Sequence, residues 1–440
     1  MSLEKKRDVI VVGAGLAGAA AALSLSKSGL NVTIMEARAR IGGREFVKAF
    51  KGANNSAPLL EYGGSWITPW HARIRTLVEE CGLSLRPRPA VTNRLWLRDG
   101  SLHSDSAVAR EHLPAHERAL ARVAADAILV KMGGDVDEKK RPLTGLSFKS
   151  YLDRLDPPKA TRNLVSAWWT VSGNGNHASV DASEFLGSCA YGGGLAEAMI
   201  DCWADTVNPG MAVLAERMID ESSAELQIEK QVARVVQSNE SVRLHTSDGQ
   251  ELEAAFCVMA LGVNQLPYVN FEPSLSTSKQ ATIGRGHEGC SFKLWIMAKG
   301  VTLGTLVTGN SSGIEFAFAE RLADNGATMI ICFGLDCDTA EPANPQWVES
   351  EIRKLFPNAE IIGYDWHDWV KDPFALGTWV AVPEGNRAAF RSENWMPEGR
   401  IVFATSDFAR ENAGWFEGAV IAGEDAATYI LSRHHERCAS

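Results

Sequence analysis

The chain has 440 residues, more than one hydrophobic core usually serves, so we expect two closely connected domains. Hydrophobic residues make up 45% and charged residues 22%, which is an ordinary globular mixture, and the formal net charge of -10 argues against nucleic-acid binding. The eight cysteines include no Cys-x-x-Cys pair, so we expect no metal site, no disulfide framework and a reducing, cytoplasmic location.

The first elements along the chain predict a nucleotide-binding unit. An apolar, β-branched run at 8–12 predicts a buried parallel strand, an Ala-rich segment up to about residue 28 predicts a helix, and 31–35 predicts a second strand that ends on Glu36. The glycines between strand and helix would permit a tight turn and a close approach to pyrophosphate, and Glu36 would accept hydrogen bonds from ribose hydroxyls. The residues of this predicted dinucleotide site are Gly13, Ala14, Gly15, Leu16, Ala17, Gly18 and Glu36.

The same segment has a competing interpretation as a secretory signal. A basic run at 5–7 precedes an apolar stretch at 9–25, the order found in signal peptides. The glycine spacing favours the strand, turn and helix instead. No other stretch is long and apolar enough to span a bilayer, so we expect no membrane association.

The residues after Glu36 carry a family resemblance. Ala37-Arg-Ala-Arg-Ile-Gly42-Gly43-Arg44 follows the acid directly, and Glu61-Tyr-Gly63-Gly64-Ser65-Trp66-Ile67 comes next. Together these segments resemble two motifs of the flavin amine oxidase family. The resemblance implies FAD as the cofactor, contacted by Ala37, Arg38, Gly42, Gly43, Arg44, Gly63, Gly64, Ser65 and Trp66.

The middle of the chain changes character between 71 and 209. Residues 107–132 and the surroundings of 163–169 predict helices, with a break at Pro157-Pro158. We expect a helical insertion at about 105–170 that covers one side of a substrate cavity.

From about 211 the pattern returns to the nucleotide-binding domain. A helix to about 223 is followed by predicted strands at 226–228, 232–236, 242–244 and 256–260. The family resemblance implies that Val232 contacts adenine. The alternative, a core valine, is compatible with that role.

Residues 284–383 are rich in predicted strands, and one of these contains Lys293. A lysine on an apolar strand is commonly an edge or snorkelling residue. The family resemblance instead implies a lysine bridged by water to the reactive flavin nitrogen. In that position its charge would assist reoxidation by dioxygen.

The last stretch resembles the family's closing motif. A buried strand at 401–404 leads to Ser406 and Asp407, and a motif at 414–419, which contains Phe416, precedes a helix at 420–431. In the family this helix points its N-terminus at the flavin, and all three named residues are implied to bind FAD. Ala404 replaces a glycine of the family pattern.

Two tryptophans match the aromatic pair that the family places beside its flavin. Trp415 lies in the closing motif and Trp379 lies before the C-terminal strand, although two core tryptophans among 13 would be an ordinary finding. The family's covalent attachment uses a cysteine at the position of Thr378, so we expect dissociable FAD. His367 and Asp368 are predicted to be structural, because neighbours on a strand point to opposite faces.

The predicted fold is α/β, or α+β overall, with a Rossmann-like FAD-binding domain interleaved with a substrate domain. We expect the FAD-binding domain at 1–80, 211–283 and 384–440, and a mixed sheet with the helical insertion at 81–210 and 284–383.

The segments 356–373 and 377–381 resemble bacterial oxidases that act on (S)-6-hydroxynicotine in nicotine breakdown. The resemblance implies hydride transfer from a pyrrolidine carbon to FAD, imine hydrolysis, and release of hydrogen peroxide after reaction with dioxygen. Lys293, Trp379 and Trp415 would be the catalytic residues. The alternatives are a polyamine or other small-amine oxidase, an amine dehydrogenase with a protein electron acceptor, and a protein that uses FAD only structurally.

Overall fold

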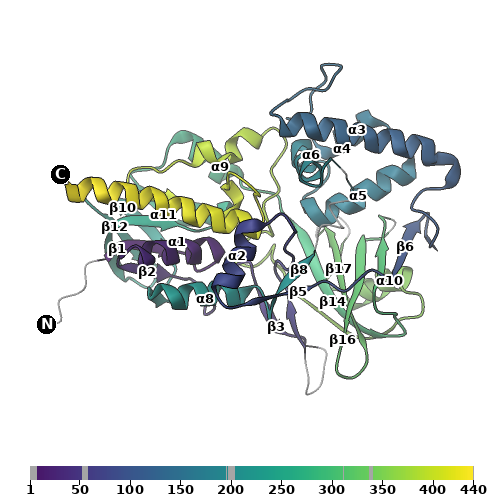
Figure 1. Ribbon diagram of the computed structural model, residues 1–440, viewed down its shortest axis with the longest axis horizontal. Helices are drawn as coiled ribbons and strands as arrows, with labels where there is room; N and C mark the ends of the chain where they lie inside the picture. Colours follow the sequence, from purple (N-terminus) through teal and green to yellow (C-terminus); the bar gives the residue numbers. More distant parts are fainter. Residues whose placement is uncertain are drawn as a thin grey trace.

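Two large β-sheets, each packed against helices, lie side by side in the computed structural model (Figure 1). The structure describes residues 7–51, 58–194, 196, 204–310, 312–335 and 340–439, with side chains up to 434. In these residues no helix is both long and apolar enough to cross a membrane.

The first sheet has a parallel centre. β1 pairs in parallel with β2 on one side and β12 on the other, while β12 pairs antiparallel with β11 near its start and parallel with β19 near its end. Four consecutive residues of β1 are buried, because helices cover both of its faces. The strands are, in spatial order, β13 (Asn270–Glu272), β10 (Val232–Gln237), β11 (Val242–Thr246), β12 (Glu251–Met259), β1 (Arg7–Val12), β2 (Val32–Met35) and β9 (Glu225–Gln227), with β19 (Ile401–Phe403) beside β12.

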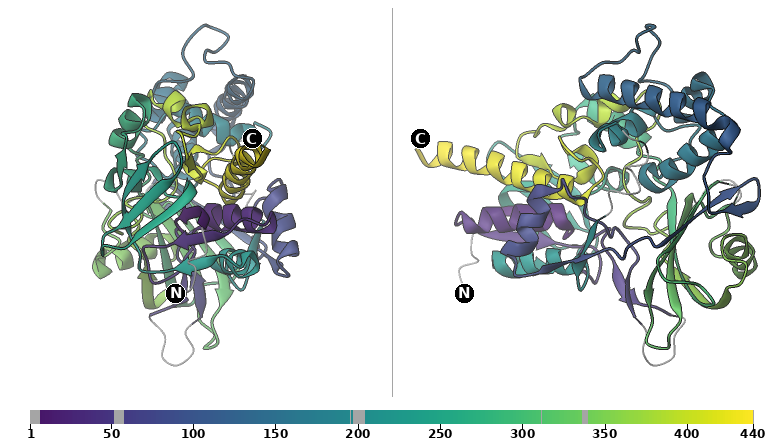
Figure 2. Two further views of the ribbon diagram at one scale, coloured as in Figure 1. Left: turned by 90° about the vertical axis from the view of Figure 1, so that its left-hand side faces the viewer. Right: turned by 45° about the vertical axis from the view of Figure 1, so that its right-hand side comes forward.

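Four helices pack on one face of this sheet: α1 (Leu16–Lys27), α2 (Ala72–Glu80), α8 (Ala212–Ser222) and α11 (Phe416–Ala439). α1 is enclosed by the sheet, α8 and α11, which explains why its small alanines are buried on most sides. Gly18 permits this approach, since a Cβ there would lie 2.0 Å from the carbonyl oxygen of Gly13. The purple α1 and yellow α11 run beside each other in Figures 1 and 2.

Shorter elements cover the other face. They are α9 (Thr277–Arg285) and the 3-10 turns η2 (Val263–Tyr268), η3 (Arg387–Phe390) and η4 (Ser392–Trp395). A further 3-10 turn, η5 (Ser406–Phe408), follows β19 directly.

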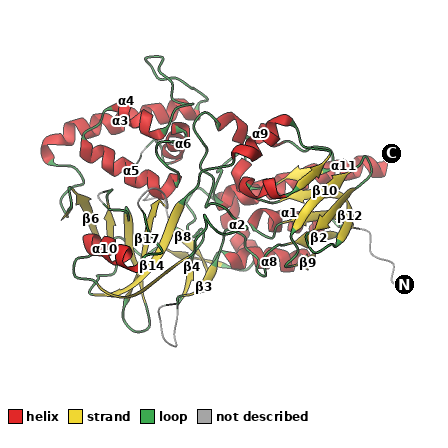
Figure 3. Cartoon of the chain, turned by 180° about the vertical axis from the view of Figure 1, so that it is seen from behind, coloured by secondary structure: helices red, strands yellow, loops and turns green. Residues whose placement is uncertain are grey.

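The second sheet is mixed and is sandwiched between helices. Its strands are, in spatial order, β18 (Glu360–Trp366), β14 (Ser291–Lys299), β17 (Thr328–Leu335), β16 (Phe316–Leu322), β15 (Thr305–Thr308), β6 (Asn93–Arg98) and β7 (Ser101–His103). One face packs against α3 (Leu113–Lys131), α4 (Phe148–Leu155), α5 (Lys159–Gly173) and α6 (Ala182–Tyr191), and the other against α10 (Pro345–Leu355). Figure 3 shows the four helices on one side of the sheet and α10 on the other.

The alternation of side chains along β14 orients Lys293. Trp295 and Met297 pack in the core beneath α3–α6, whereas Leu294 and Ile296 pack in the core beneath α10. Lys293 is two residues from Trp295 on the same strand, so its side chain lies on the face of the sheet that α3–α6 cover. Two small sheets, β3 (Val47–Ala49) with β4 (Leu59–Glu61) and β5 (Ser84–Pro87) with β8 (Asp205–Asn208), join the larger layers.

The predicted fold class is confirmed, with three corrections to the elements. The helix expected at 107–132 begins at Leu113, after the turn η1 (Arg110–His112), and the helical region continues beyond 170 to Tyr191. The final helix begins at Phe416 rather than at residue 420. β18 ends at Trp366, so the expectation that His367 and Asp368 lie on a strand was wrong. The domain boundaries stay a prediction.

Candidate active site

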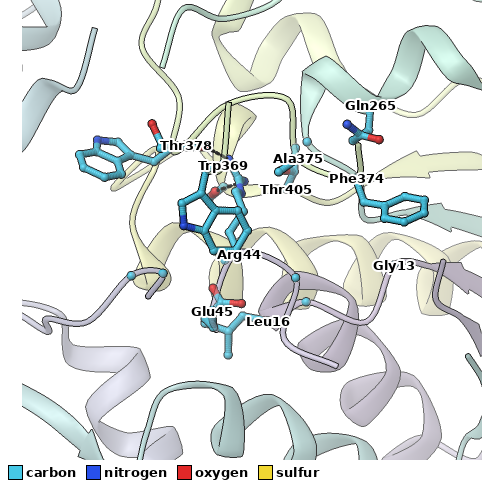
Figure 4. A pocket seen from close by; sticks show the side chains of 18 of the residues that line it. Gly13, Leu16, Arg44, Glu45, Gln265, Trp369, Phe374, Ala375, Thr378 and Thr405 are labelled. Carbon is cyan, nitrogen blue, oxygen red and sulfur yellow. Dashed lines mark hydrogen bonds between the residues drawn. The ribbon is translucent and has the colours of Figure 1, made fainter. Parts of the chain in front are cut away.

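A cavity of about 240 Å³ lies where the two sheets meet. Its wall combines the glycine turn and α1 of the first sheet with β14 and β17 of the second. Figure 4 shows Arg44 and Trp369 at its centre, Thr378 on one side, and Phe374 and Gln265 on the other. The predicted residues that line it are Gly13, Gly15, Leu16, Ala17, Glu36, Ala37, Arg38, Gly43, Arg44, Gly63, Gly64, Ser65, Trp66, Val232, Lys293, Trp379, Ser406, Trp415 and Phe416.

Four predicted residues do not line this cavity. Ala14 donates its backbone N–H to Glu36 Oε2 at 2.9 Å, and its carbonyl oxygen accepts from the N–H of Gly42 at 2.9 Å. Gly18 packs on Gly13, and Asp407 lies behind Arg44. These four residues lie outside the cavity and support the residues that line it.

The N-terminus of α1 faces the cavity without a side-chain cap. Gly15 is the N-cap residue, and the first turn contains no acidic residue, so the helix leaves N–H groups available for an anion such as a phosphate. Gly43 approaches Gly15 closely, since a Cβ at Gly43 would lie 3.4 Å from the Cα of Gly15. The buried carboxylate of Glu36 accepts from the N–H groups of Ala14 and Arg38 and borders the same space. This end of the cavity therefore fits a dinucleotide.

Arg44 connects three segments beside this site. Its guanidinium donates to Asp407 Oδ1 at 2.8 Å, to Ser406 Oγ at 3.0 Å and to the carbonyl oxygen of Thr378 at 3.0 Å. Burial alone would raise the pKa of Asp407, but attraction to Arg44 and the N–H of Val263 outweigh it and lower that pKa. Asp407 therefore carries a charge that Arg44 compensates.

A second ion pair, between Arg38 and Asp372, also holds the side chain of His367. Arg38 contacts the Asp372 carboxylate at 2.8 Å, and His367 Nε2 lies 2.7 Å from Asp372 Oδ2. Asp368 is occupied separately, with its carboxylate accepting from the N–H of Lys371 at 3.0 Å. His367 and Asp368 thus have different partners, and each contributes to the local structure.

Lys293 is buried and lines the same cavity as Glu36. Its Nζ donates to the carbonyl oxygen of Gly63 and to Ser65 Oγ at 2.6 Å, so it is anchored to the predicted glycine motif. The rings of Trp66 and Phe333 lie 5.8 and 5.5 Å from Nζ. Burial lowers the pKa of Lys293 to about 8.

The neighbouring carboxyl of Glu61 is shifted in the opposite direction. Burial raises the pKa of Glu61 to about 7, although the N–H of Met211 and the charge of Lys293 oppose the shift. Lys293 and Glu61 thus form a buried pair whose charges depend on each other.

Trp379 and Trp415 line the cavity and are both half-buried. Trp379 Nε1 donates to the carbonyl oxygen of Ser172, and its own carbonyl oxygen accepts from Asn174 Nδ2 at 2.9 Å. The ring of Trp415 packs edge-on against His71, with centroids 5.1 Å apart. Thr378, at the position relevant to covalent attachment, donates its hydroxyl to Asn174 Oδ1.

Several lining residues were missed by the sequence analysis. Val171 and Ser172 come from α5, in the region where substrate contacts were expected but no residue could be chosen. Phe333 lies opposite Lys293 in the register of β14 and β17, a pairing that no local pattern reveals. Trp369 donates a hydrogen bond from its Nε1 to the carbonyl oxygen of Tyr62 at 2.9 Å. Tyr62 belongs to the glycine motif at 61–67, and this link to the motif was the only feature that could have pointed to Trp369.

Comparisons with known proteins identify the family of the chain. The model of the family of flavin-containing amine oxidoreductases matches residues 16–431. The chain is 27% identical to pseudooxynicotine dehydrogenase of Pseudomonas sp, over 97% of this chain and 86% of that protein. It is 26% identical to (S)-6-hydroxynicotine oxidase of Paenarthrobacter nicotinovorans, over 96% of this chain and 99% of that protein.

Solved structures show the same fold. Wild-type putrescine oxidase bound to putrescine superposes with a TM-score of 0.85 at 21% identity, covering 98% of this chain and 100% of that one. Cyclohexylamine oxidase from Brevibacterium oxydans gives 0.83 at 21% identity, covering 98% and 100%. With the family model matched over nearly the whole length, this chain belongs to the flavin-containing amine oxidoreductases.

Proposed function

We propose that the protein is an FAD-dependent oxidase of a small amine, with (S)-6-hydroxynicotine as the first candidate substrate. The observation that carries the proposal is the arrangement of one cavity wall. Lys293, Trp379 and Trp415 border the same cavity as the dinucleotide motif, although they are far apart in the sequence. A cofactor with only a structural role would need none of these three.

The residues present fit FAD. The uncapped N-terminus of α1 would hold the pyrophosphate, Glu36 the ribose and Val232 the adenine. Gly64 and Phe416 line the same cavity and are in close contact, since a Cβ at Gly64 would lie 2.4 Å from the Phe416 ring. Since Thr378 has no thiol, we propose that FAD is bound without a covalent bond through this position.

Bound FAD would accept a hydride from the carbon beside the amine nitrogen and would later pass its electrons to dioxygen, giving hydrogen peroxide. The two tryptophans would exclude water and orient the amine. Lys293 would place its charge where negative charge develops on oxygen.

The titratable groups in the wall favour hydride transfer over proton abstraction. Of the two described carboxylates that line the cavity, Glu36 contacts the first residues of the glycine turn, and Glu45 lies beside Leu16 in Figure 4. Burial lowers the pKa of His287 to about 4, and its Nδ1 already accepts from the N–H of Gly289 at 3.0 Å. Burial raises the pKa of Glu45 to about 7, but none of these three groups is a base strong enough to remove a proton from carbon.

The nicotine-pathway assignment draws on the names of two relatives, one an oxidase and one a dehydrogenase. Because one relative is a dehydrogenase, a protein electron acceptor in place of dioxygen is the alternative for reoxidation of the flavin. A polyamine or other small-amine oxidase is the alternative for the substrate. A cytoplasmic location, which was inferred from the dispersed cysteines, stays a prediction.

Steady-state turnover would test substrate and acceptor together. The FAD-loaded protein would be given (S)-6-hydroxynicotine, putrescine or N-methylputrescine in air, with peroxide measured, and then given an artificial electron acceptor without air. We expect stoichiometric peroxide from (S)-6-hydroxynicotine. Turnover of that compound only with the artificial acceptor would indicate a dehydrogenase, and turnover of the polyamines alone would replace the substrate.

A further inference from the structure

A second cavity, of about 330 Å³, lies on the far side of Trp415. Trp415 and Ser172 line both cavities, so the indole is a wall that they share. The wall of the second cavity also includes residues of α6 and of the segments 387–393 and 409–413, together with Trp70, His71, Val382 and Asp407. A molecule in it would be separated from the first cavity by one half-buried side chain.

The carboxylate of Glu184 is the feature of this second cavity that points to a ligand. Glu184 lies in the first turn of α6 and is half-buried, and its backbone N–H donates to the carbonyl oxygen of Asp181. Within the described part of the chain, its carboxylate accepts no hydrogen bond and forms no ion pair. Burial raises its pKa to about 7, while Arg387 opposes that shift. The Glu184 oxygens are not fully buried, and they can therefore accept hydrogen bonds from a ligand in the cavity.

Arg387 also lines the cavity and is half-buried; its charge lowers the pKa of Glu184, although the two side chains form no ion pair in the described residues. The remaining charged groups are paired or exposed. Asp407 is paired with Arg44, and Arg410 is paired with Glu411 and Asp425 on the surface. Arg391 and Glu393 lie exposed on one loop and carry opposite charges.

Nearer Trp415, burial lowers the pKa of His71 to about 4, so the imidazole adds no positive charge at neutral pH. The face of the shared indole would itself attract a cation.

We propose that this second cavity is a vestibule in which Glu184 collects a protonated amine before the amine passes Trp415. The inference rests on the proposed function and adds a recruiting site to it. It also supplies a carboxylate of the kind that a polyamine-oxidising alternative would require beside its substrate path.

A paired substitution tests the role of Glu184. In anaerobic stopped-flow reduction of the FAD-loaded protein by (S)-6-hydroxynicotine and by putrescine, Glu184→Gln should raise the apparent Kd of the reducing amine about tenfold and leave the limiting rate unchanged. Glu384→Gln is the matched control, because Glu384 is exposed and lines neither cavity. Equal Kd values in the wild type and Glu184→Gln would overturn the proposal.

Filling the vestibule tests the path. Gly187 lines the second cavity on α6, and a Cβ added there meets no atom within 4 Å, so Gly187→Leu should fold and occupy free space. We expect at least a fivefold fall in the second-order rate constant of reduction for Gly187→Leu and little change for Gly187→Ala. An unchanged constant in the leucine variant would refute passage through this cavity.

Binding of tetramethylammonium separates the two proposals, because the nitrogen of this cation has no lone pair and the cation therefore cannot be oxidised by loss of a hydride. Calorimetry on the FAD-loaded protein should show that Glu184→Gln weakens its binding about tenfold. Equal affinity would refute the vestibule even if amines reduce the flavin. Weakened binding together with no reduction by any amine would instead contradict the proposed function and leave the cation site supported.

Discussion

Replacing Arg44 by methionine should destabilise the protein by about 3 kcal/mol at pH 8. Asp407 has a side chain with 0% exposure, and after the substitution it would keep the N–H of Val263, at 2.9 Å, but no countercharge. Breaking a buried ion pair from one side costs about 3–5 kcal/mol. The Arg44 side chain is 28% exposed, which places the expected cost at the lower end of that range.

The cost of Arg44→Met should shrink as the pH falls. In the wild type the pKa of Asp407 is lowered, so its stabilising contribution is present above the unfolded pKa and is lost only as pH falls through the lower folded value. Without Arg44, burial dominates and the folded pKa rises above the unfolded one. Protonation at pH 5.5 would then relieve much of the penalty.

Urea unfolding followed by tryptophan fluorescence, at pH 5.5 and 8 and at two FAD concentrations, would measure this effect. The two concentrations separate instability of the chain from weakened cofactor binding. Arg44→Met with Asp407→Asn should recover most of the lost stability, because no charge is then buried alone. A loss below about 1 kcal/mol at pH 8, a loss independent of pH, or a double variant as unstable as the single one would refute the reasoning.

Three further substitutions test other parts of the site. Lys293→Met should slow flavin reoxidation by dioxygen about a hundredfold and leave anaerobic reduction nearly unchanged, whereas equal slowing of both would remove its assigned role. Because burial lowers the pKa of Lys293 to about 8, wild-type reoxidation should slow as pH rises through 8, and the methionine variant should lose this step. Trp415→Ala should weaken amine oxidation with FAD still bound, as judged by flavin absorbance after gel filtration; loss of FAD would make it a packing residue. Gly64→Ala should cost about 1–3 kcal/mol by displacing Phe416, whereas Gly284→Ala, which lies in α9 and where a Cβ meets nothing within 4 Å, should cause no loss of stability in thermal unfolding.

The nucleotide-binding start was predictable because its signals are local. The run at 8–12, the glycines and Glu36 follow one another within thirty residues, and the structure forms β1, α1 and β2 from them in that order. Lys293 was also predicted on a strand, since its apolar neighbours alternate over β14.

Contacts that depend on the pairing of distant segments were not predictable from the sequence. Phe333 reaches Lys293 only because β17 lies beside β14, and Arg44 reaches Asp407 only when the two ends of the chain meet. Glu184 falls in a helical region with no motif, and its lack of a partner is a property of the folded cavity. The placement of His367 and Asp368 on a strand failed because β18 ends one residue earlier, where His367 turns to Asp372.

The most direct test of the account is anaerobic mixing of the FAD-loaded protein with (S)-6-hydroxynicotine, with putrescine and N-methylputrescine in parallel. We expect rapid bleaching of the flavin absorbance by the first compound, and little or none by the polyamines. Bleaching by the polyamines alone would keep the chemistry and contradict the substrate. A flavin that stays oxidised with every amine would contradict the assignment of Lys293, Trp379 and Trp415 to an amine-oxidising site.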